Sequence, residues 1–289
     1  MPGRPSRSPT VRHKRLTAEL RRLRQESGLT RDEVATRFDW HPTKITRIET
    51  GQWTRLNLRD VRDLLDIYGV TDEVTRDALV QLARESRQKG WWHSYGDVLP
   101  SEYANFIGLE SEAASVRTYQ QVLVPGLLQT EDYARSVIEA FRPGDSAEDI
   151  DRRVAVRHER QRRVTGERSL QLSAVLGEGV VHQLVGDRRT TAGQLQFLAE
   201  AGDLPTVMIQ VLPYAAGAHG AMVGSFEILG FPEPIDPDVV YLENMSSALF
   251  LEEPDAVARY VQVFDYLRAA ALSPKATSDM LKAATEELA

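Results

Sequence analysis

The chain has 289 residues, of which 42% are hydrophobic and 27% charged, values typical of a globular protein with about two domains. It contains no cysteine, which excludes disulfide bonds, thiolate metal sites and cysteine nucleophiles and predicts a cytoplasmic location. No apolar run reaches the roughly 18 residues of a membrane span, and no apolar segment of a secretory signal follows the basic N-terminus. We therefore expect no contact with a membrane.

Charge is distributed unevenly along the chain. The formal net charge is −7, yet residues 1–90 carry 19 Lys/Arg against 13 Asp/Glu, whereas residues 91–289 carry 16 against 29. A basic N-terminal part joined to an acidic remainder is typical of a protein that contacts phosphate at one end only. The first 90 residues are therefore the place to look for a nucleic-acid reader.

The N-terminal part divides into an arm and a helical bundle. Residues 1–15 are rich in Pro, Arg and Ser and lack apolar periodicity, which predicts a disordered basic arm that either contacts DNA or is a solvated tail. Apolar residues at helical spacing predict a five-helix domain over residues 16–89. The expected helices cover residues 17–27, 30–38, 42–50, 58–68 and 72–89. Thr30 and Glu33 have the spacing of a capping box at the start of the second helix.

The third helix of this bundle, residues 42–50, has one apolar and one polar face. Ile45 and Ile48 are expected to point into the core. The polar side chains expected to point away from the core are Thr43, Lys44, Thr46 and Arg47.

The segment from Leu20 to Gly51 resembles the Xre/Cro-repressor family of helix-turn-helix proteins. The residues that carry the resemblance are Leu20-x-x-Leu23-Arg24, Gly28-Leu29-Thr30-x-x-Glu33-Val34-Ala35 and Thr43-x-Ile45-Thr46-Arg47-Ile48-Glu49-x-Gly51. The chain departs from this family in the turn, where Asp39 and Trp40 replace a small residue or glycine.

The resemblance implies that the helix at 42–50 enters the major groove of DNA and reads base edges. Arg and Lys donate to guanine, and Thr contacts thymine methyls or phosphates. The implied base readers are Thr43, Lys44, Thr46 and Arg47. Contacts to the DNA backbone are expected from Arg31, Gln52, Trp53 and Arg55, whereas Glu49 is expected to be structural. The alternative for Arg47 is a surface salt bridge to Glu49 or Asp32.

Residues 90–168 are interpreted as a helical connecting region. Trp91 and Trp92 open it with an aromatic cluster, which is either a ligand or partner site or a core at the domain junction. A charged helix follows at residues 149–164, and its arginines, Arg153 and Arg157 among them, could form a basic patch for an acidic partner. His219, in the loop 213–224, is a further candidate for ligand contact.

Residues 169–289 read as an α+β regulatory domain with a mixed sheet. Strands are expected at residues 169–176, 207–212, 224–231 and 239–243, and helices at 194–201, 254–271 and 277–288. The predicted fold class is thus multidomain: an all-α five-helix helix-turn-helix bundle followed by an α+β domain.

Two motifs in the second part, Tyr103-x-x-Phe106-Ile107-Gly108-Leu109-Glu110-x-Glu112-Ala113 and Val124–Arg135, resemble the C-terminal domain of actinobacterial WhiJ-like regulators. The resemblance covers roughly residues 90–285. It implies a transcriptional regulator of development or secondary metabolism. It also implies a small partner protein encoded by a neighbouring gene, in an arrangement compared with toxin–antitoxin pairs.

No catalytic motif stands out in the chain. Glu178 and His182 are four residues apart, as in half of a helical metal site, but a second histidine is missing. Glu227, Glu243 and His219 have no recognisable partner. We therefore predict no catalytic residue, no metal and no cofactor, and we disfavour an enzyme with a tethered DNA reader.

These observations predict a sequence-specific transcriptional regulator that binds double-stranded DNA as a homodimer and is controlled through its C-terminal domain. The alternative is an antitoxin-like interaction protein that binds a small partner protein and autoregulates its own operon.

Overall fold

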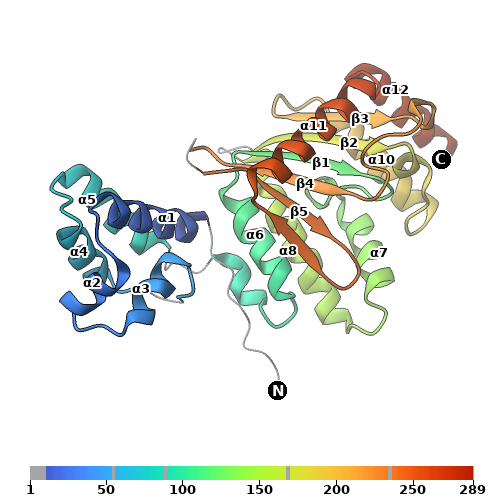
Figure 1. The fold of residues 1–289 in the computed structure, drawn as a ribbon. Coiled ribbons are helices and arrows are strands. Elements are labelled where there is room, and N and C mark those ends of the chain that lie inside the picture. Colours follow the sequence, from blue (N-terminus) through green and yellow to red (C-terminus); the bar gives the residue numbers. More distant parts are fainter. Residues whose placement is uncertain (1–10, 54–55, 87–89, 167–169, 234–235, 289) are drawn as a thin grey trace. The chain divides into compact units, whose positions relative to one another are not determined.

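The computed structural model describes residues 11–53, 56–86, 90–166, 170–233 and 236–288. It divides into two units, Met1–Ser94 and Tyr95–Ala289. Helical apolar spacing in the first and alternating apolar strands in the second produce two different architectures, an all-α bundle and an α+β domain (Figure 1). The predicted fold class is confirmed.

The five helices of the N-terminal unit enclose one apolar core. They are α1 (Val11–Glu26), α2 (Arg31–Arg37), α3 (Pro42–Glu49), α4 (Leu58–Ile67) and α5 (Glu73–Glu85). The core side chains recur at helical spacing on each helix; among those fully buried are Leu16, Leu20, Val34, Ile45, Val61 and Leu64. Each helix therefore buries one stripe, and the outer face of α3 is left exposed.

Helix α1 begins at Val11, so the prediction of a disordered arm as far as residue 15 is wrong for residues 11–15. The reason is tertiary: the His13 ring is 7% exposed and stacks on Trp53 with ring centroids 3.5 Å apart. This contact joins sequence positions forty residues apart, so no local pattern announces it. Residues 1–10 of the predicted arm lie outside the described residues.

The second unit is built on a six-stranded sheet with the order β3-β2-β1-β4-β5-β6. The strands are β1 (Ser115–Gln120), β2 (Gln171–Gly177), β3 (Val207–Leu212), β4 (Phe226–Gly230), β5 (Val239–Glu243) and β6 (Ala248–Leu251). Strand β2 pairs in parallel with β1 and with β3. The pairs β1–β4, β4–β5 and β5–β6 are antiparallel. The mixed sheet is thus as predicted, although β1 and β6 were not expected.

Strand β1 corrects the division of this part into a connecting region at 90–168 and a domain at 169–289. It pairs with β2 on one side and with β4 on the other, so it lies in the middle of the sheet. Residues before and after position 168 therefore share one domain. Its sequence, Ser-Val-Arg-Thr-Tyr-Gln, alternates weakly in polarity, and its polar side chains have partners distant in the chain: Arg117 pairs with Asp238, and the Thr118 hydroxyl donates to the Phe226 carbonyl.

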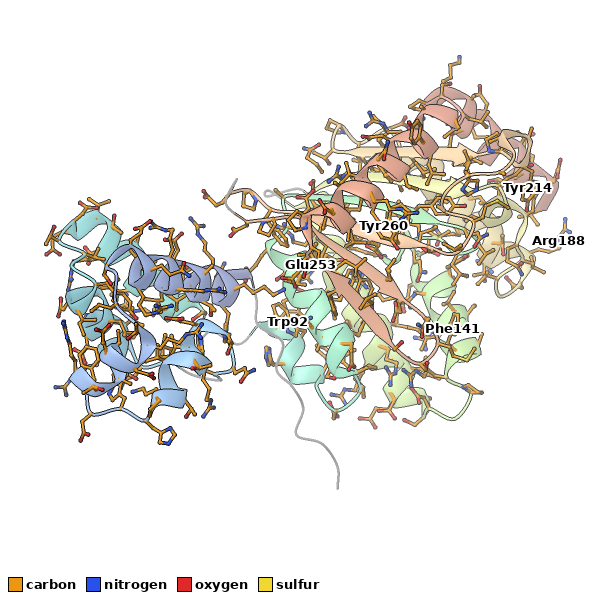
Figure 2. The ribbon with its side chains drawn as sticks, in the orientation of Figure 1. Trp92, Phe141, Arg188, Tyr214, Glu253 and Tyr260 are labelled. Atoms are coloured by element: carbon orange, nitrogen blue, oxygen red, sulfur yellow. The ribbon has the colours of Figure 1, made fainter. Side chains whose placement is uncertain are left out.

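The helices form layers on the two faces of the sheet. They are α6 (Ser101–Glu112), α7 (Glu131–Phe141), α8 (Ala147–Thr165), α9 (Gly179–His182), α10 (Arg188–Ala201), α11 (Pro254–Ala270) and α12 (Pro274–Leu288), with short 3-10 turns η2 (Gly126–Leu128) and η3 (Tyr214–Ala216). A further 3-10 turn, η1 (Trp91–Tyr95), spans the division between the two units. Helix α11 covers one face, whereas α6 and α8 lie on the other (Figure 1). Tyr260 of α11 packs edge-on against Phe226 of β4, with centroids 5.1 Å apart (Figure 2).

The edge strand β3 is covered by the chain that joins α11 to α12. The Leu272 amide donates to the Val211 carbonyl at 2.8 Å, and the Val211 amide donates to the Thr277 hydroxyl at 3.0 Å. Arg188 at the start of α10 donates to the carbonyl of Glu287 at 2.5 Å, which ties α10 to the end of α12 (Figure 2). These contacts protect this edge of the sheet from pairing with another chain.

Candidate functional site

Glu49, at the C-terminal end of α3, fixes the position of that helix. Its carboxylate is buried and accepts hydrogen bonds from Arg24 Nε of α1 at 2.5 Å and from Arg31 Nε of α2 at 2.8 Å. One carboxylate of α3 thus joins three helices, because an arginine of α1 and an arginine of α2 each donate a charge-assisted hydrogen bond to it. The structural role predicted for Glu49 is confirmed.

Local sequence also fixes where α2 and α3 begin. The Thr30 hydroxyl and the Glu33 carboxylate form the predicted capping box at the start of α2. His41 caps α3 by accepting from the Thr43 amide, and Pro42 occupies the first turn. In the turn between them, Asp39 has a φ of +52°, the left-handed conformation that glycine adopts more easily. The unusual Asp39 therefore keeps the backbone shape that the resemblance implied.

Three of the predicted base readers, Thr43, Thr46 and Arg47, are exposed on the outer face of α3. They line a hollow between this helix and the start of α2. Its other lining residues are Arg24, Thr30, Arg31, Asp32, Pro42 and Gln52. The hollow therefore combines short hydroxyl side chains with arginine guanidinium groups, a combination suited to base edges and phosphates.

Arg47 carries the exposed positive charge on this face. Its Nε donates to the Gln52 carbonyl at 3.1 Å, which orients the guanidinium along the helix. Within the described ranges it forms no salt bridge, so the alternative pairing with Glu49 or Asp32 is wrong. Glu49 is instead enclosed by Arg24 and Arg31. The remaining guanidinium nitrogens of Arg47 are thus available for an acceptor from outside the chain.

Lys44 differs from the other three predicted readers. Its ammonium lies 2.9 Å from the Asp60 carboxylate of α4 and 3.4 Å from the centroid of the Trp40 ring. Both contacts hold the charge against the domain, so a base contact by Lys44 would have to break an ion pair and a cation–π interaction. Lys44 is therefore less suited to a base contact than Thr43, Thr46 and Arg47.

The four residues predicted to contact the DNA backbone have different environments. Arg31 keeps part of its guanidinium exposed while bonded to Glu49, and Gln52 is exposed. Trp53 does not fit the prediction: its indole N–H, the only donor of that side chain, donates to the Ile48 carbonyl at 3.2 Å. The Trp53 ring stacks on the His13 ring. Arg55 lies outside the described residues.

His13 is neutral at physiological pH. Burial lowers its pKa to about 4, and the charge of Lys14 acts in the same direction, while the hydrogen bond to the Gly51 carbonyl at 3.1 Å opposes both. Nε2 therefore carries the proton that it donates to Gly51. This bond ties α1 to Gly51, just beyond the end of α3.

We expect the N-terminal unit to lose stability in mild acid through His13. The folded-state pKa lies below the unfolded value of 6.5, so the contribution is complete above pH 6.5 and is lost as pH falls towards 4. Its full size is on the order of 3 kcal/mol. Chemical unfolding of the wild type and of His13→Phe at pH 7 and pH 4.5 measures it. An equal loss in both proteins would assign the acid sensitivity to other groups.

The remaining predicted contact residues are mostly occupied within the chain. Trp92 is buried and meets Trp91 edge-on, with centroids 5.9 Å apart. Arg153 pairs with Asp145 at 2.8 Å. His219 packs edge-on against Tyr119, and its Nδ1 accepts from the Ala221 amide at 3.3 Å. These contacts are those of structural side chains.

The predicted basic patch on α8 is wrong as an exposed surface. Arg160 is 4% exposed and makes two hydrogen bonds, at 2.8 and 2.6 Å, to the carboxylate of Glu110 on α6, which is 1% exposed. The remaining nitrogen of Arg160, Nη1, donates to the Tyr103 hydroxyl. Arg157 donates to the Gln129 side chain. One sequence feature indicates that Arg160 is buried: it lies four residues from Val156 and four from Val164, on the buried stripe of α8.

Next to this pair, on neighbouring strands, lie two polar groups that the sequence analysis did not connect. Glu227 of β4 and Tyr241 of β5 are opposite each other in the sheet register. Burial raises the pKa of Glu227 to about 8, aided by the charges of Glu110 and Glu243, so this carboxyl is mostly protonated at neutral pH. The Tyr241 hydroxyl is buried and forms no hydrogen bond within the part of the chain that the structure describes.

The features examined for catalysis do not assemble into a site. Glu178 and His182 lie 3.5 Å apart, but the other oxygen of Glu178 accepts from the Tyr214 amide at 2.6 Å, which is a structural bond. Across the described residues there is no group of three His, Cys, Asp or Glu side chains that could hold a metal ion. None of the helices in this part of the chain is both long and apolar enough to span a bilayer.

Comparison with known proteins matches both units. Residues 15–79 match a model described as a helix-turn-helix domain, and residues 103–283 match one described as a domain of unknown function (DUF5753). No curated protein and no solved structure matches the chain.

Proposed function

We propose that this chain, which belongs to the DUF5753 family and carries a helix-turn-helix domain, is a sequence-specific transcriptional regulator. In this proposal helix α3 reads operator DNA in the major groove. The helix-turn-helix match supports a DNA-binding regulator rather than an enzyme. The observation that carries the finer proposal is Arg47, an exposed guanidinium on the outer face of α3 with no ion pair among the described residues.

Within α3 we assign base reading to Thr43, Thr46 and Arg47. Arg47 is suited to a bidentate contact with guanine, and the two threonines are suited to thymine methyl groups. Arg31 and Gln52, at the rim of the same hollow, are assigned to phosphates.

Substituting Arg47 by alanine should weaken operator binding by about 1–3 kcal/mol while leaving non-specific binding nearly unchanged. Selection of bound sequences from a random DNA library supplies the operator, and titration at fixed salt measures the affinities. Arg62→Ala, an exposed arginine of α4, is the matched control. Equal operator affinity for Arg47→Ala and the wild type would contradict the assignment of α3 as reader.

Regulation through the C-terminal domain is part of the proposal. Its support is the buried Tyr241 hydroxyl, which has no hydrogen-bond partner among the described residues and which a polar group of a bound effector would satisfy. The closer resemblance to actinobacterial WhiJ-like regulators, the homodimer and the cytoplasmic location also stay predictions. The antitoxin-like alternative gains no support from a basic patch on α8, because Arg152, Arg153 and Arg160 are paired with Asp97, Asp145 and Glu110.

A further inference from the structure

Three arginines of helix α8 differ in how their charges are matched. Arg153 pairs with Asp145, and Arg160 makes two hydrogen bonds to the Glu110 carboxylate. Arg157, which lies between them in sequence, forms no ion pair within the part of the chain that the structure describes. This guanidinium therefore lacks the counter-charge that the other two have.

The partners of Arg157 are neutral groups. It donates to the side-chain oxygen of Gln129, which is buried, and the Tyr103 hydroxyl is a second acceptor beside it. The Arg157 side chain is half-buried, and burial lowers the pKa of its guanidinium because the charged form is poorly solvated. Burying a cation without an anion costs free energy, so this position favours a negatively charged group from outside the chain.

Tyr241 of β5 borders the same polar region, between the sheet and helices α6 and α8. Its ring stacks on Phe106 of α6, with centroids 4.2 Å apart. The Arg160 guanidinium lies 5.0 Å from the centroid of the same Phe106 ring. Both Arg157 and Tyr241 interact electrostatically with Tyr103 and Arg160, so the two side chains lie around one region.

This region presents hydrogen-bond donors that the chain does not use. Tyr241 is 3% exposed, and its hydroxyl has no hydrogen-bond partner among the described residues. Glu227, opposite it in the sheet register, is half-buried and mostly protonated at neutral pH, so it offers a second O–H group. Together with the guanidinium of Arg157, these groups are suited to the oxygen atoms of an anion.

The charges of this region leave an excess of one positive charge. Arg157 and Arg160 carry two positive charges, Glu110 carries one negative charge, and Glu227 is mostly neutral. Glu243, on the same face of β5, is exposed, so water and salt screen its charge. One anionic group therefore balances the region.

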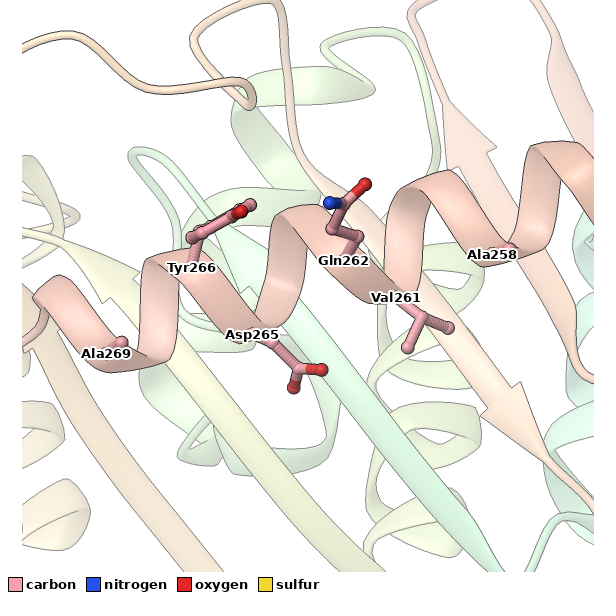
Figure 3. Close-up of a pocket in the computed structure, with 6 residues that line it drawn as sticks. All are labelled: Ala258, Val261, Gln262, Asp265, Tyr266 and Ala269. Atoms are coloured by element: carbon pink, nitrogen blue, oxygen red, sulfur yellow. The ribbon is translucent and has the colours of Figure 1, made fainter.

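The other face of the sheet is different in character. Helix α11 buries Val257, Phe264 and Leu267 there in an apolar core. On the outer side of α11 is only a shallow hollow, lined mainly by apolar atoms (Figure 3). The unmatched guanidinium and the unpartnered hydroxyl thus lie together on the α6 and α8 side of the sheet.

We propose that the region bordered by Arg157, Glu227 and Tyr241 binds a small molecule through a carboxylate or phosphate group, which accepts hydrogen bonds from these three side chains. The ligand is small because the region lies inside the domain, between the sheet and two helices. The inference rests on the proposed function, because it identifies the chemical class of the effector that controls the regulator. The competing interpretation is a purely structural role, in which Arg157 is satisfied by Gln129 alone.

Melting of the full chain in different anions tests the assignment. Sodium acetate and sodium phosphate are each compared with sodium chloride at equal ionic strength by differential scanning calorimetry. At least one of the two should raise the melting temperature of the C-terminal domain by about 2–4 °C as binding approaches saturation. The anion with the larger shift distinguishes a carboxylate ligand from a phosphate ligand. No shift relative to chloride with either anion would overturn the proposal.

Variants of α8 separate binding from a general salt effect. Arg157→Gln removes the charge and should abolish the shift, whereas Arg157→Lys keeps the charge and should retain part of it. Arg153→Gln is the matched control on the same helix: its arginine already pairs with Asp145, so the shift should be unchanged. A shift of equal size in Arg157→Gln and the wild type would overturn the proposal.

Tyr241→Phe removes the unpartnered hydroxyl with little change in shape. In chloride this variant should be at least as stable as the wild type, and its apparent affinity for the anion should be about tenfold weaker. Tyr133→Phe is the control, because the Tyr133 hydroxyl accepts from the Val124 amide at 3.3 Å. Its loss should lower stability and leave the anion affinity unchanged. Wild-type anion affinity in Tyr241→Phe would contradict the proposed site.

The two hypotheses fail in different ways. If α3 reads DNA while this region is only structural, Arg47→Ala will lose operator binding, and the wild type and Arg157→Gln will respond equally to the anion. If the region binds an anion while α3 does not read DNA, the melting shifts will appear as predicted and Arg47→Ala will bind the operator as the wild type does. Calorimetry and DNA titration of the same preparations distinguish these outcomes.

Discussion

Replacing Arg160 by alanine is expected to destabilise the C-terminal domain by about 3–5 kcal/mol, a large part of the total stability of a domain. The variant leaves the Glu110 carboxylate, 1% exposed, without the guanidinium that donates two hydrogen bonds to it. It also removes the donor to the Tyr103 hydroxyl. Urea unfolding followed by circular dichroism measures the loss.

Two further variants make the Arg160 experiment decisive. Arg162→Ala changes an exposed arginine on the same helix, which pairs with exposed-side Glu159, and should cost less than about 1 kcal/mol. The double variant Glu110→Leu/Arg160→Met removes both charges and should be more stable than Arg160→Ala. A double variant no more stable than the single one would show that packing, rather than the unpaired carboxylate, dominates the loss.

Replacing Glu49 by alanine should be the most damaging substitution in the N-terminal unit. It leaves buried Arg24 without its anion and releases Arg31 from α3, so we expect a loss of about 3 kcal/mol. Operator affinity should fall as well, because α3 loses its attachment to α1 and α2. Thermal unfolding and DNA titration of the full chain measure the two effects.

The pattern across variants separates positioning from reading. Glu49→Ala should lose both stability and operator binding, whereas Arg47→Ala should lose binding alone. Glu26→Ala, which removes an exposed partner of Arg22 on α1, should change neither by more than about 1 kcal/mol. Full operator binding by a stable Glu49→Ala protein would show that the arginine–carboxylate cluster does not position the recognition helix.

The helix-turn-helix unit could be predicted closely because its signals are local. The capping pair Thr30 and Glu33, Pro42 at a first turn, and apolar residues at helical spacing each act within a few positions, and α2, α3 and α4 begin and end near the predicted residues. The roles of individual side chains were less predictable. Lys44 and Trp53 look like DNA contacts in sequence, but Asp60, Ile48 and His13 occupy them from other segments.

In the C-terminal domain, strands made of alternating or continuous apolar residues were predicted, and β5 and β3 have the expected bounds. Strand β1 was missed because its polar residues are satisfied by partners distant in the chain: the Thr118 hydroxyl donates to the Phe226 carbonyl. The α8 arginines were read as an exposed patch for the same reason. Only packing brings Glu110, fifty residues away, against Arg160.

Sequence alone therefore determined the fold class, the helix-turn-helix unit and the polar, exposed face of α3 that we propose to read DNA, because periodicity and capping depend on neighbouring residues. The tertiary structure decided which charged side chains are free. Among the described residues Arg47 is exposed without an ion pair, whereas Lys44, Arg153 and Arg160 are held by carboxylates from other elements. A charge is available to DNA or to a partner only when the fold does not neutralise it first, and that depends on contacts distant in sequence.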